Sequence, residues 1–237
     1  MTRRLYEEDA YQRECTALVT VAAEAGLVLD QTVFYAAGGG QPGDTGTIEW
    51  GEGQTLRIED TRKGEGDDIV HVVAAGEPLP PPGTRVRGRI DWQRRHRHMR
   101  MHTCLHLLCA VVKAPVTGGN LSADKGRLDF DLPEASLDKA SLTESLNALI
   151  DADTPTRLEW IDDAELDARP ELVKTMSVAP PRGAGKVRLL AIPGVDLQPC
   201  GGTHVARLGE IGRVRVSKIE KKSRLNRRIA IVLEEEP

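Results

Sequence analysis

The stretch His102-Thr103-Cys104-Leu105-His106 decides how the rest of this sequence is interpreted. On a helix, residues four apart lie on one face, so the two histidines direct their imidazoles toward one point. The stretch Cys200-Gly201-Gly202-Thr203-His204 repeats that spacing, but its two glycines predict a loop. Three imidazoles and one thiolate suit zinc. We therefore expect one Zn²⁺ per chain, held by His102, His106, Cys200 and His204.

The composition is that of an ordinary globular protein. The chain has 237 residues, of which 40% are hydrophobic, 29% charged and only 3% aromatic. This length allows one large domain or two smaller ones. No apolar run approaches the length of a membrane span, and the first residues lack the apolar core of a signal peptide, so we expect a cytoplasmic protein without a membrane partner. Four cysteines are too few for a disulfide framework.

Charge is sorted along the chain although its net value is only −4. Residues 85–102 contain seven Arg and one Asp, and residues 213–228 contain eight Lys or Arg and one Glu. Each basic block adjoins one half of the expected metal site. This placement favours a polyanionic partner, and a solvated basic surface is the alternative.

Short alternating strands separated by turns fill the first 90 residues and predict a small β-barrel. Between two of them lies Phe34-Tyr35-Ala36-Ala37-Gly38-Gly39-Gly40-Gln41-Pro42-Gly43-Asp44-Thr45-Gly46, with five glycines in nine residues. Glycines allow close approach to a ligand or positive φ angles, and a hairpin loop is the alternative. The strands are expected at 15–21, 26–29, 47–50, 55–60, 69–73 and 86–91.

The periodicity changes near Asp91, where a helix through Val111 is expected because Met101, Leu105 and Leu108 share one face. A turn follows at Gly118–Asn120, and Ser141-Leu142-Thr143-Glu144 resembles a capping box that opens a second helix. Further strands are expected at 127–132, 156–161 and 187–192, a short helix at 162–169, and a hairpin at 211–220 and 228–233. The fold class is therefore α+β: a barrel domain, residues 1–90, and a two-layer α/β domain with an antiparallel sheet, residues 91–237.

Four separated motifs resemble one family, the editing domain of alanyl-tRNA synthetase and its freestanding relatives, the AlaX proteins. The glycine stretch at 34–46, the first histidine motif at 102–108, Gln198-Pro199-Cys200-Gly201-Gly202-Thr203-His204-Val205 and the segment 219–228 match in that order. The presence of both the glycine-rich and the zinc part is similar to the medium-length AlaX type. The sequence departs from the pattern at Leu105, often Thr in the synthetases, and at Ser223, commonly Gly.

The resemblance implies a translation-protein-like barrel and a zinc-dependent editing domain that deacylates mischarged tRNA(Ala). It implies cleavage of the Ser-tRNA(Ala) ester, with Gly-tRNA(Ala) as a second substrate. The chain is too short to hold an aminoacylation domain as well, so we expect a freestanding enzyme that acts in trans, with a monomer favoured. Gln41 and Thr103 are the candidate catalytic groups that would recognise the serine hydroxyl. The residues expected to bind tRNA are Arg94, Arg95, Arg97, Arg100, Lys222, Asn226, Arg227 and Arg228.

Two alternatives remain open at this stage. A threonyl-type editing domain would act on seryl-tRNA with a related fold, and a zinc-stabilised RNA-binding module would use the same basic blocks without hydrolysis. A metalloprotease is disfavoured because no Glu lies between His102 and His106. Four protein ligands are typical of a structural zinc site, whereas hydrolytic zinc keeps a position open, so the role of the metal is undecided.

Overall fold

The computed structural model describes residues 1–132, 137–176 and 185–234, and it divides into two compact units, Met1–His96 and Arg97–Pro237. Helix α1 (Trp92–Val112) contains the point of division. The predicted boundary at residue 90 is the end of the last strand before this helix. Each unit has its own antiparallel sheet, which confirms the α+β class.

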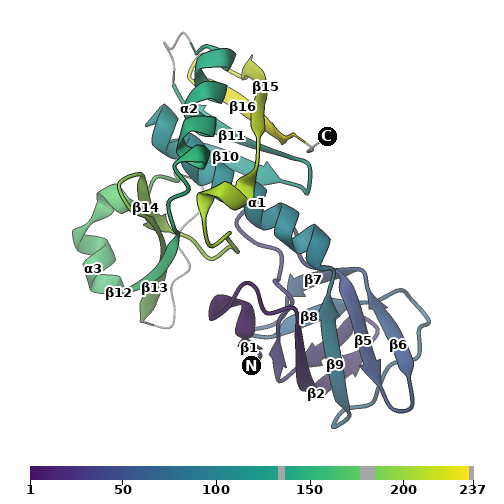
Figure 1. Cartoon of the computed structure of the whole chain (residues 1–237). Helices are drawn as coiled ribbons and strands as arrows, with labels where there is room; N and C mark the ends of the chain where they lie inside the picture. The colour runs from purple at the N-terminus through teal and green to yellow at the C-terminus, as the bar shows by residue number, and fades with distance from the viewer. Residues whose placement is uncertain (133–136, 177–184, 235–237) are drawn as a thin grey trace. The chain divides into compact units, whose positions relative to one another are not determined.

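A seven-stranded antiparallel sheet, in the order β6-β5-β9-β2-β3-β8-β7, forms the N-terminal unit (Figure 1). Alternating side chains from these strands enclose a core around the fully buried Phe34, as the alternation in the sequence predicts. Within the described residues 1–96, no ladder joins the edge strands β6 and β7, so closure into a barrel stays a prediction. The strands are β2 (Glu14–Ala23), β3 (Gly26–Leu29), β5 (Gly46–Trp50), β6 (Gln54–Ile58), β7 (Asp60–Lys63), β8 (Ile69–Val72) and β9 (Arg85–Ile90), beside the short parallel pair β1 (Arg3–Arg4) and β4 (Gln31–Thr32) and the 3₁₀ turn η1 (Leu5–Glu7).

The glycine stretch folds as a tight turn in this unit. Gly38 and Gln41 exchange backbone hydrogen bonds of 3.0 and 3.1 Å, and Gly39 and Gly40 have φ angles of 57° and 84°. Positive φ at both central positions is the geometry of a type I′ turn, which glycine accepts at low cost. At Gly43 a Cβ atom would lie 2.0 Å from the carbonyl oxygen of Thr61, so only glycine fits.

The second unit contains a four-stranded antiparallel sheet, in the order β10-β11-β16-β15. Its strands are β10 (Val116–Leu121), β11 (Lys125–Asp131), β15 (Val214–Lys221) and β16 (Asn226–Leu233). Helix α2 (Lys139–Asp151) packs against β15 through Leu142, Leu146 and Ile150. Helix α1 lies against β11, where Met101 and Leu105 fill the space beside Gly126. Both helices therefore pack against this sheet.

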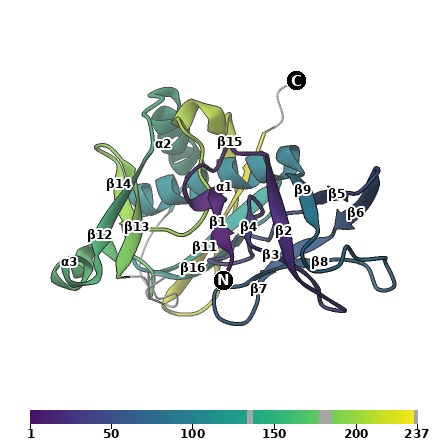
Figure 2. The ribbon, with the colours of Figure 1, turned by 90° about the horizontal axis from the view of Figure 1, so that it is seen from below.

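A three-stranded antiparallel sheet, β12 (Arg157–Asp162), β13 (Lys186–Ile192) and β14 (Asp196–Pro199), completes this unit. Helix α3 (Asp163–Ala168) follows β12 and lies beside it (Figure 2). Leu166 of this helix packs in one core cluster with Ile161 of β12. Two 3₁₀ turns, η2 (Pro170–Leu172) and η3 (Leu208–Ile211), connect the elements. Strand β14 ends at Pro199, directly before the Cys200 motif, so this sheet positions the second half of the metal site.

Two expectations were wrong in their local detail. The Gly118–Asn120 segment belongs to β10 and does not form a turn, because its residues pair with β11 after a bulge between Val116 and Gly118. Helix α2 begins at Lys139 with Asp138 as its N-cap, three residues before Leu142, where a capping box at Ser141 would start it. The Asp138 carboxylate accepts a hydrogen bond of 2.8 Å from the backbone N–H of Ser141.

Candidate metal centre

Helix α1 places His102 and His106 side by side, with ring centroids 5.4 Å apart. Both are nearly buried, with 8% and 6% of their surface exposed. The predicted spacing of one helical turn therefore brings the two imidazoles to one face. The helix holds this position because its Met101 and Leu105 pack on the sheet.

The loop after β14 brings Cys200 and His204 to the same point. The Cys200 Sγ atom lies 3.1 Å from Nε2 of His204 and 3.6 Å from Nε2 of His102. The backbone N–H of Gly202 donates to the same sulfur at 3.4 Å. The ring centroid of His204 is 4.5 Å from that of His102 and 4.9 Å from that of His106.

The four predicted ligands fit a zinc ion. One ligand atom from each of His102, His106, Cys200 and His204 lies within 4.8 Å of all the others, and all four residues are buried. Tetrahedral zinc with bonds of about 2.0–2.3 Å separates its ligands by roughly 3.3–3.8 Å, which this cluster can reach with small side-chain shifts. The structure thus brings together all four residues, although 93 residues separate His106 from Cys200 in the sequence.

Two polar side chains orient the histidine rings. The Nδ1–H of His106 donates to the Asp196 carboxylate at 3.1 Å, which leaves its Nε2 for a metal. The Thr103 hydroxyl donates to the Met99 carbonyl at 2.8 Å. Because its proton is used there, the Thr103 oxygen accepts a hydrogen bond from the Nδ1–H of His204 at 3.2 Å. In the neutral form that binds a metal, both rings therefore keep their Nε2 atoms for the ion.

The ionisation of the cluster follows from its burial and its charges. Burial alone raises the pKa of Cys200, but the surrounding histidines outweigh it and hold the pKa of this thiol well below its usual range. Burial lowers the pKa of His204 to about 3. Burial also opposes a proton on His106, but the Cys200 thiolate and Asp196 together raise its pKa to about 9. The thiolate, the form that binds metals, is therefore favoured here.

Two supporting residues, Asp196 and Arg188, were missed from the sequence. Asp196 is 0% exposed at its side chain and also accepts hydrogen bonds from Lys174 and from Gln198, the latter at 2.6 Å. Arg188 is buried within β13 and donates to carbonyl oxygens of the Cys200 loop. A charged residue inside an apolar strand, as in Val187-Arg188-Leu189-Leu190, is the signal that could have found Arg188.

The two candidate catalytic groups lie in different units. Thr103 is completely buried on α1, and its hydroxyl oxygen also accepts from the backbone N–H of Val205 at 3.2 Å. Gln41 belongs to the glycine turn of the N-terminal unit and is 2% exposed. Their role in substrate recognition stays a prediction.

The residues expected to bind tRNA differ in their availability. Arg95 is 0% exposed and forms a buried, bidentate ion pair with Asp44, so it holds the N-terminal unit together and is not free to meet a phosphate. Arg94 donates to the Gly43 carbonyl, and Arg228 pairs with Asp129 at 2.7 Å. The others make surface contacts: Arg97 with Asp124, Arg100 with the Ile211 carbonyl, Lys222 with Glu220, Asn226 with Thr117, and Arg227 with the Ser223 carbonyl.

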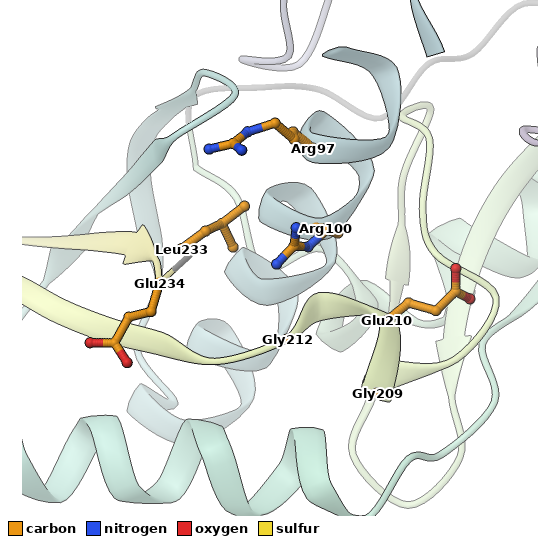
Figure 3. A pocket seen from close by; sticks show the side chains of 7 residues that line it. All are labelled: Arg97, Arg100, Gly209, Glu210, Gly212, Leu233 and Glu234. Carbon is orange, nitrogen blue, oxygen red and sulfur yellow. The ribbon is translucent and has the colours of Figure 1, made fainter. Parts of the chain in front are cut away.

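Two hollows lie in the second unit. One, of about 510 Å³, is lined by Arg97, Arg100, Gly209, Glu210, Gly212, Leu233 and Glu234. Figure 3 shows Arg97 and Arg100 projecting from neighbouring turns of α1, with the carboxylates of Glu210 and Glu234 at its sides. The other, of about 440 Å³, reaches Lys174 and Asp196, next to the support of His106. No metal ligand among the described residues lines either hollow.

The sequence matches two family models that divide along the chain much as the structure does. Residues 7–94 match the class II (A) tRNA synthetases, and residues 187–230 match the second additional domain of threonyl and alanyl tRNA synthetases. In the parts that the structure describes, no helix is both long and apolar enough to cross a membrane. The fold and the His₃Cys cluster therefore define a protein of the synthetase editing class.

Full-length relatives narrow this class to one family. The chain is 36% identical to the alanyl-tRNA editing protein AlaX-M of Methanosarcina acetivorans over 98% of its own length and 99% of the relative's. It is 35% identical to AlaX-L of Pyrococcus horikoshii over 94% of its length, and 36% identical to the alanine–tRNA ligase of Sulfurisphaera tokodaii over 93%, which is 25% of that ligase. The chain belongs to the alanyl-tRNA editing proteins of the AlaX-M type, and it is an aminoacyl-tRNA hydrolase.

Proposed function

We propose that this chain is a zinc-dependent hydrolase that removes serine from mischarged tRNA(Ala) in trans, with glycine as its second substrate. The observation that carries the proposal is the buried cluster of three imidazoles and one thiol, whose ligand atoms all lie within 4.8 Å of one another. The names of the relatives support alanyl-tRNA as the class of substrate.

Physical chemistry explains why such a second site is needed. A pocket shaped for alanine cannot strongly reject a smaller residue, nor one that only adds a hydroxyl, because such differences give only about 1–3 kcal/mol. A separate site that hydrogen-bonds the serine hydroxyl selects serine over alanine, which the alanine-shaped pocket cannot do. Alanine would leave the polar groups of that site unpaired and would be spared.

The chain's own residues would hold the metal ion and orient its ligands. A bound Zn²⁺ would supply a Lewis acid that polarises the ester carbonyl or orients the amino group of the substrate. His102, His106, Cys200 and His204 would hold it, while Asp196 and Thr103 keep the rings of His106 and His204 turned toward it. The burial of these groups limits access of water and strengthens their mutual attraction.

Gln41 and Thr103 are our candidates for recognising the serine hydroxyl. Replacement of Thr103 by Val keeps the shape of the side chain and removes the hydroxyl. If Thr103 also recognises the substrate, T103V lowers the ratio of serine to glycine release by the zinc-saturated protein. If it only orients His204, zinc affinity falls and the ratio is unchanged. Gln41→Glu and Gln41→Ala test the turn residue by the same ratio.

The available basic residues would bind the phosphates of tRNA. Arg97 and Arg100 flank one hollow on α1, and Lys222 and Arg227 lie at the tip of the β15–β16 hairpin. Ion contacts of this kind release counterions, so binding falls as salt rises, with a slope of about 0.7–0.9 per phosphate contact in the logarithmic plot. We expect R97M and R227M each to reduce the slope of tRNA binding, and K113M, at the end of α1, to leave it unchanged.

The decisive experiment measures release of serine from Ser-tRNA(Ala) and binding of the same tRNA, for wild type and C200A. We expect C200A to lose zinc and most of its activity, while tRNA binding stays within about twofold. A matched control, C15A, removes a buried thiol from the other unit and should stay active. Zinc-loaded wild type that binds tRNA but releases no serine would show that the chain is an RNA-binding module.

Two further properties belong to the same proposal. Preference for seryl-tRNA(Thr) over seryl-tRNA(Ala) in this assay would favour the threonyl-type alternative. We propose a monomer in the cytoplasm, where tRNA is charged, and light scattering on the purified chain tests the monomer.

A further inference from the structure

Arg188 has an unusual position for a charged residue. It lies in the middle of β13, where Val187, Leu189 and Leu190 are completely buried, and it is itself only 4% exposed. Removing a guanidinium from water costs several kcal/mol unless its donors are satisfied. A buried arginine at such a place therefore indicates a specific set of hydrogen bonds.

The hydrogen bonds of Arg188 are directed at the metal-binding loop. Its Nε–H donates to the carbonyl oxygen of Cys200 at 2.9 Å, and its terminal nitrogen donates to the carbonyl oxygen of Gly202. Its own backbone carbonyl accepts from the N–H of Cys200 at 3.0 Å. Arg188 thus hydrogen-bonds both the N–H and the carbonyl of Cys200, and also the carbonyl of Gly202, two residues further along the loop.

The loop needs such a contact because of its composition. Gly201 and Gly202 separate the ligands Cys200 and His204, and consecutive glycines have more conformational freedom to lose than any other pair. In the structure, however, the Cys200 Sγ and the His204 Nε2 atoms lie only 3.1 Å apart. The planar fork of one guanidinium, bonded to the carbonyls on either side of Gly201, fixes the backbone between the two ligands.

We propose that Arg188 is the positioning residue of the metal centre: it orders the Gly201–Gly202 backbone so that Cys200 and His204 reach one ion together. This inference rests on the metal binding proposed above. The role is geometric, since lysine would keep the charge but has no planar pair of donors with which to bridge two carbonyls.

The test measures metal binding directly, by competition for Zn²⁺ with a chromophoric chelator and by the absorption spectrum of the Co²⁺-loaded protein. We expect both R188K and R188M to bind Zn²⁺ about 10–100-fold more weakly than wild type, as loss of supporting contacts around metal ligands does. The thiolate-to-Co²⁺ charge-transfer band should weaken in both. Methylguanidinium added to R188A should restore part of that band.

The controls separate this inference from the loss of the fold and from the proposed function. R157K and R157M alter an exposed arginine of the neighbouring strand β12 and should keep wild-type affinity. If R188M does not fold, the inference is tested by R188K, which keeps the aliphatic part of the side chain and its charge. Wild-type affinity and an unchanged Co²⁺ spectrum in R188K would overturn the inference alone. A wild-type chain that binds no Zn²⁺ would overturn the metal site and this inference with it.

Discussion

Asp196 connects a metal ligand to the rest of the domain through a single carboxylate. Burial alone raises its pKa, but its contacts with His106, Lys174 and Gln198 outweigh burial and hold the pKa below its usual range. Lys174 itself is fixed by its backbone, since its carbonyl accepts from the N–H of Val116 at 2.9 Å. The orientation of His106 therefore depends on residues from β10, β14 and the segment before residue 177.

Replacement of Asp196 by Asn should weaken metal binding. An amide keeps the size of the side chain, but its NH₂ group cannot accept the hydrogen bonds that both carboxylate oxygens now receive. We expect D196N to lower Zn²⁺ affinity about 10–100-fold, measured by chelator competition. K186M, an exposed change on β13, is the control, and an unchanged affinity of D196N would show that Asp196 does not orient His106.

His71 gives the N-terminal unit a dependence on pH that does not involve the metal. It is completely buried, its Nδ1–H donates to the Leu27 carbonyl at 3.1 Å, and its Nε2 accepts from the Thr32 hydroxyl at 2.7 Å. Burial lowers its pKa from 6.5 to about 4. The unfolded chain binds the proton first, so stability is fully present above pH 6.5 and is lost as pH falls toward 4.

The loss of stability over this interval should be of the order of 3 kcal/mol. Tryptophan fluorescence during urea unfolding measures it for the N-terminal unit, because Trp50 and Trp92 remain there when the exposed Trp160 is replaced by Phe. In H71N the free energy of unfolding should vary less between pH 6.5 and 4. An equally steep dependence in H71N would assign the effect to other groups.

At the scale of elements, helix α1 carries two of the proposed metal ligands and packs on its sheet through a close contact of Met101 and Leu105 with Gly126. A Cβ atom at Gly126 would lie 2.7 Å from the Met101 sulfur and 3.2 Å from Leu105. We expect G126A to destabilise the C-terminal unit by about 1–3 kcal/mol through overpacking and to weaken Zn²⁺ binding by displacing His102. The control G118A meets nothing closer than 3.8 Å, and equal stability of the two variants would contradict this packing.

Elements with strong periodicity could be predicted from the sequence, and those that depend on neighbours could not. Helix α1 and strand β3 follow the apolar pattern, and the ligand set follows from two spacings of four residues. Strand β10 was missed because its glycines signal a turn locally, whereas pairing with β11 makes them part of a sheet. Asp196 and Arg188 were missed because their roles arise only when β13 and β14 meet α1 and the loop.

At the scale of the whole chain, the metal centre lies entirely within the unit Arg97–Pro237, whereas the glycine turn lies in Met1–His96. The N-terminal unit has its own core and its own buried ion pair between Arg95 and Asp44. Both units match models of tRNA synthetase families; the proposed ester hydrolysis belongs to the second unit, and the role of Gln41 in the first stays a prediction.

The central claim is that this chain hydrolyses the wrong aminoacyl ester and spares the right one. Its most direct test compares kcat/KM for release of serine and of alanine from the same tRNA(Ala), using one zinc-loaded preparation. We predict that serine is released at least about 100-fold more efficiently, because alanine leaves the hydroxyl-binding groups unpaired. Equal efficiency for the two esters, or release of alanine alone, would contradict the account.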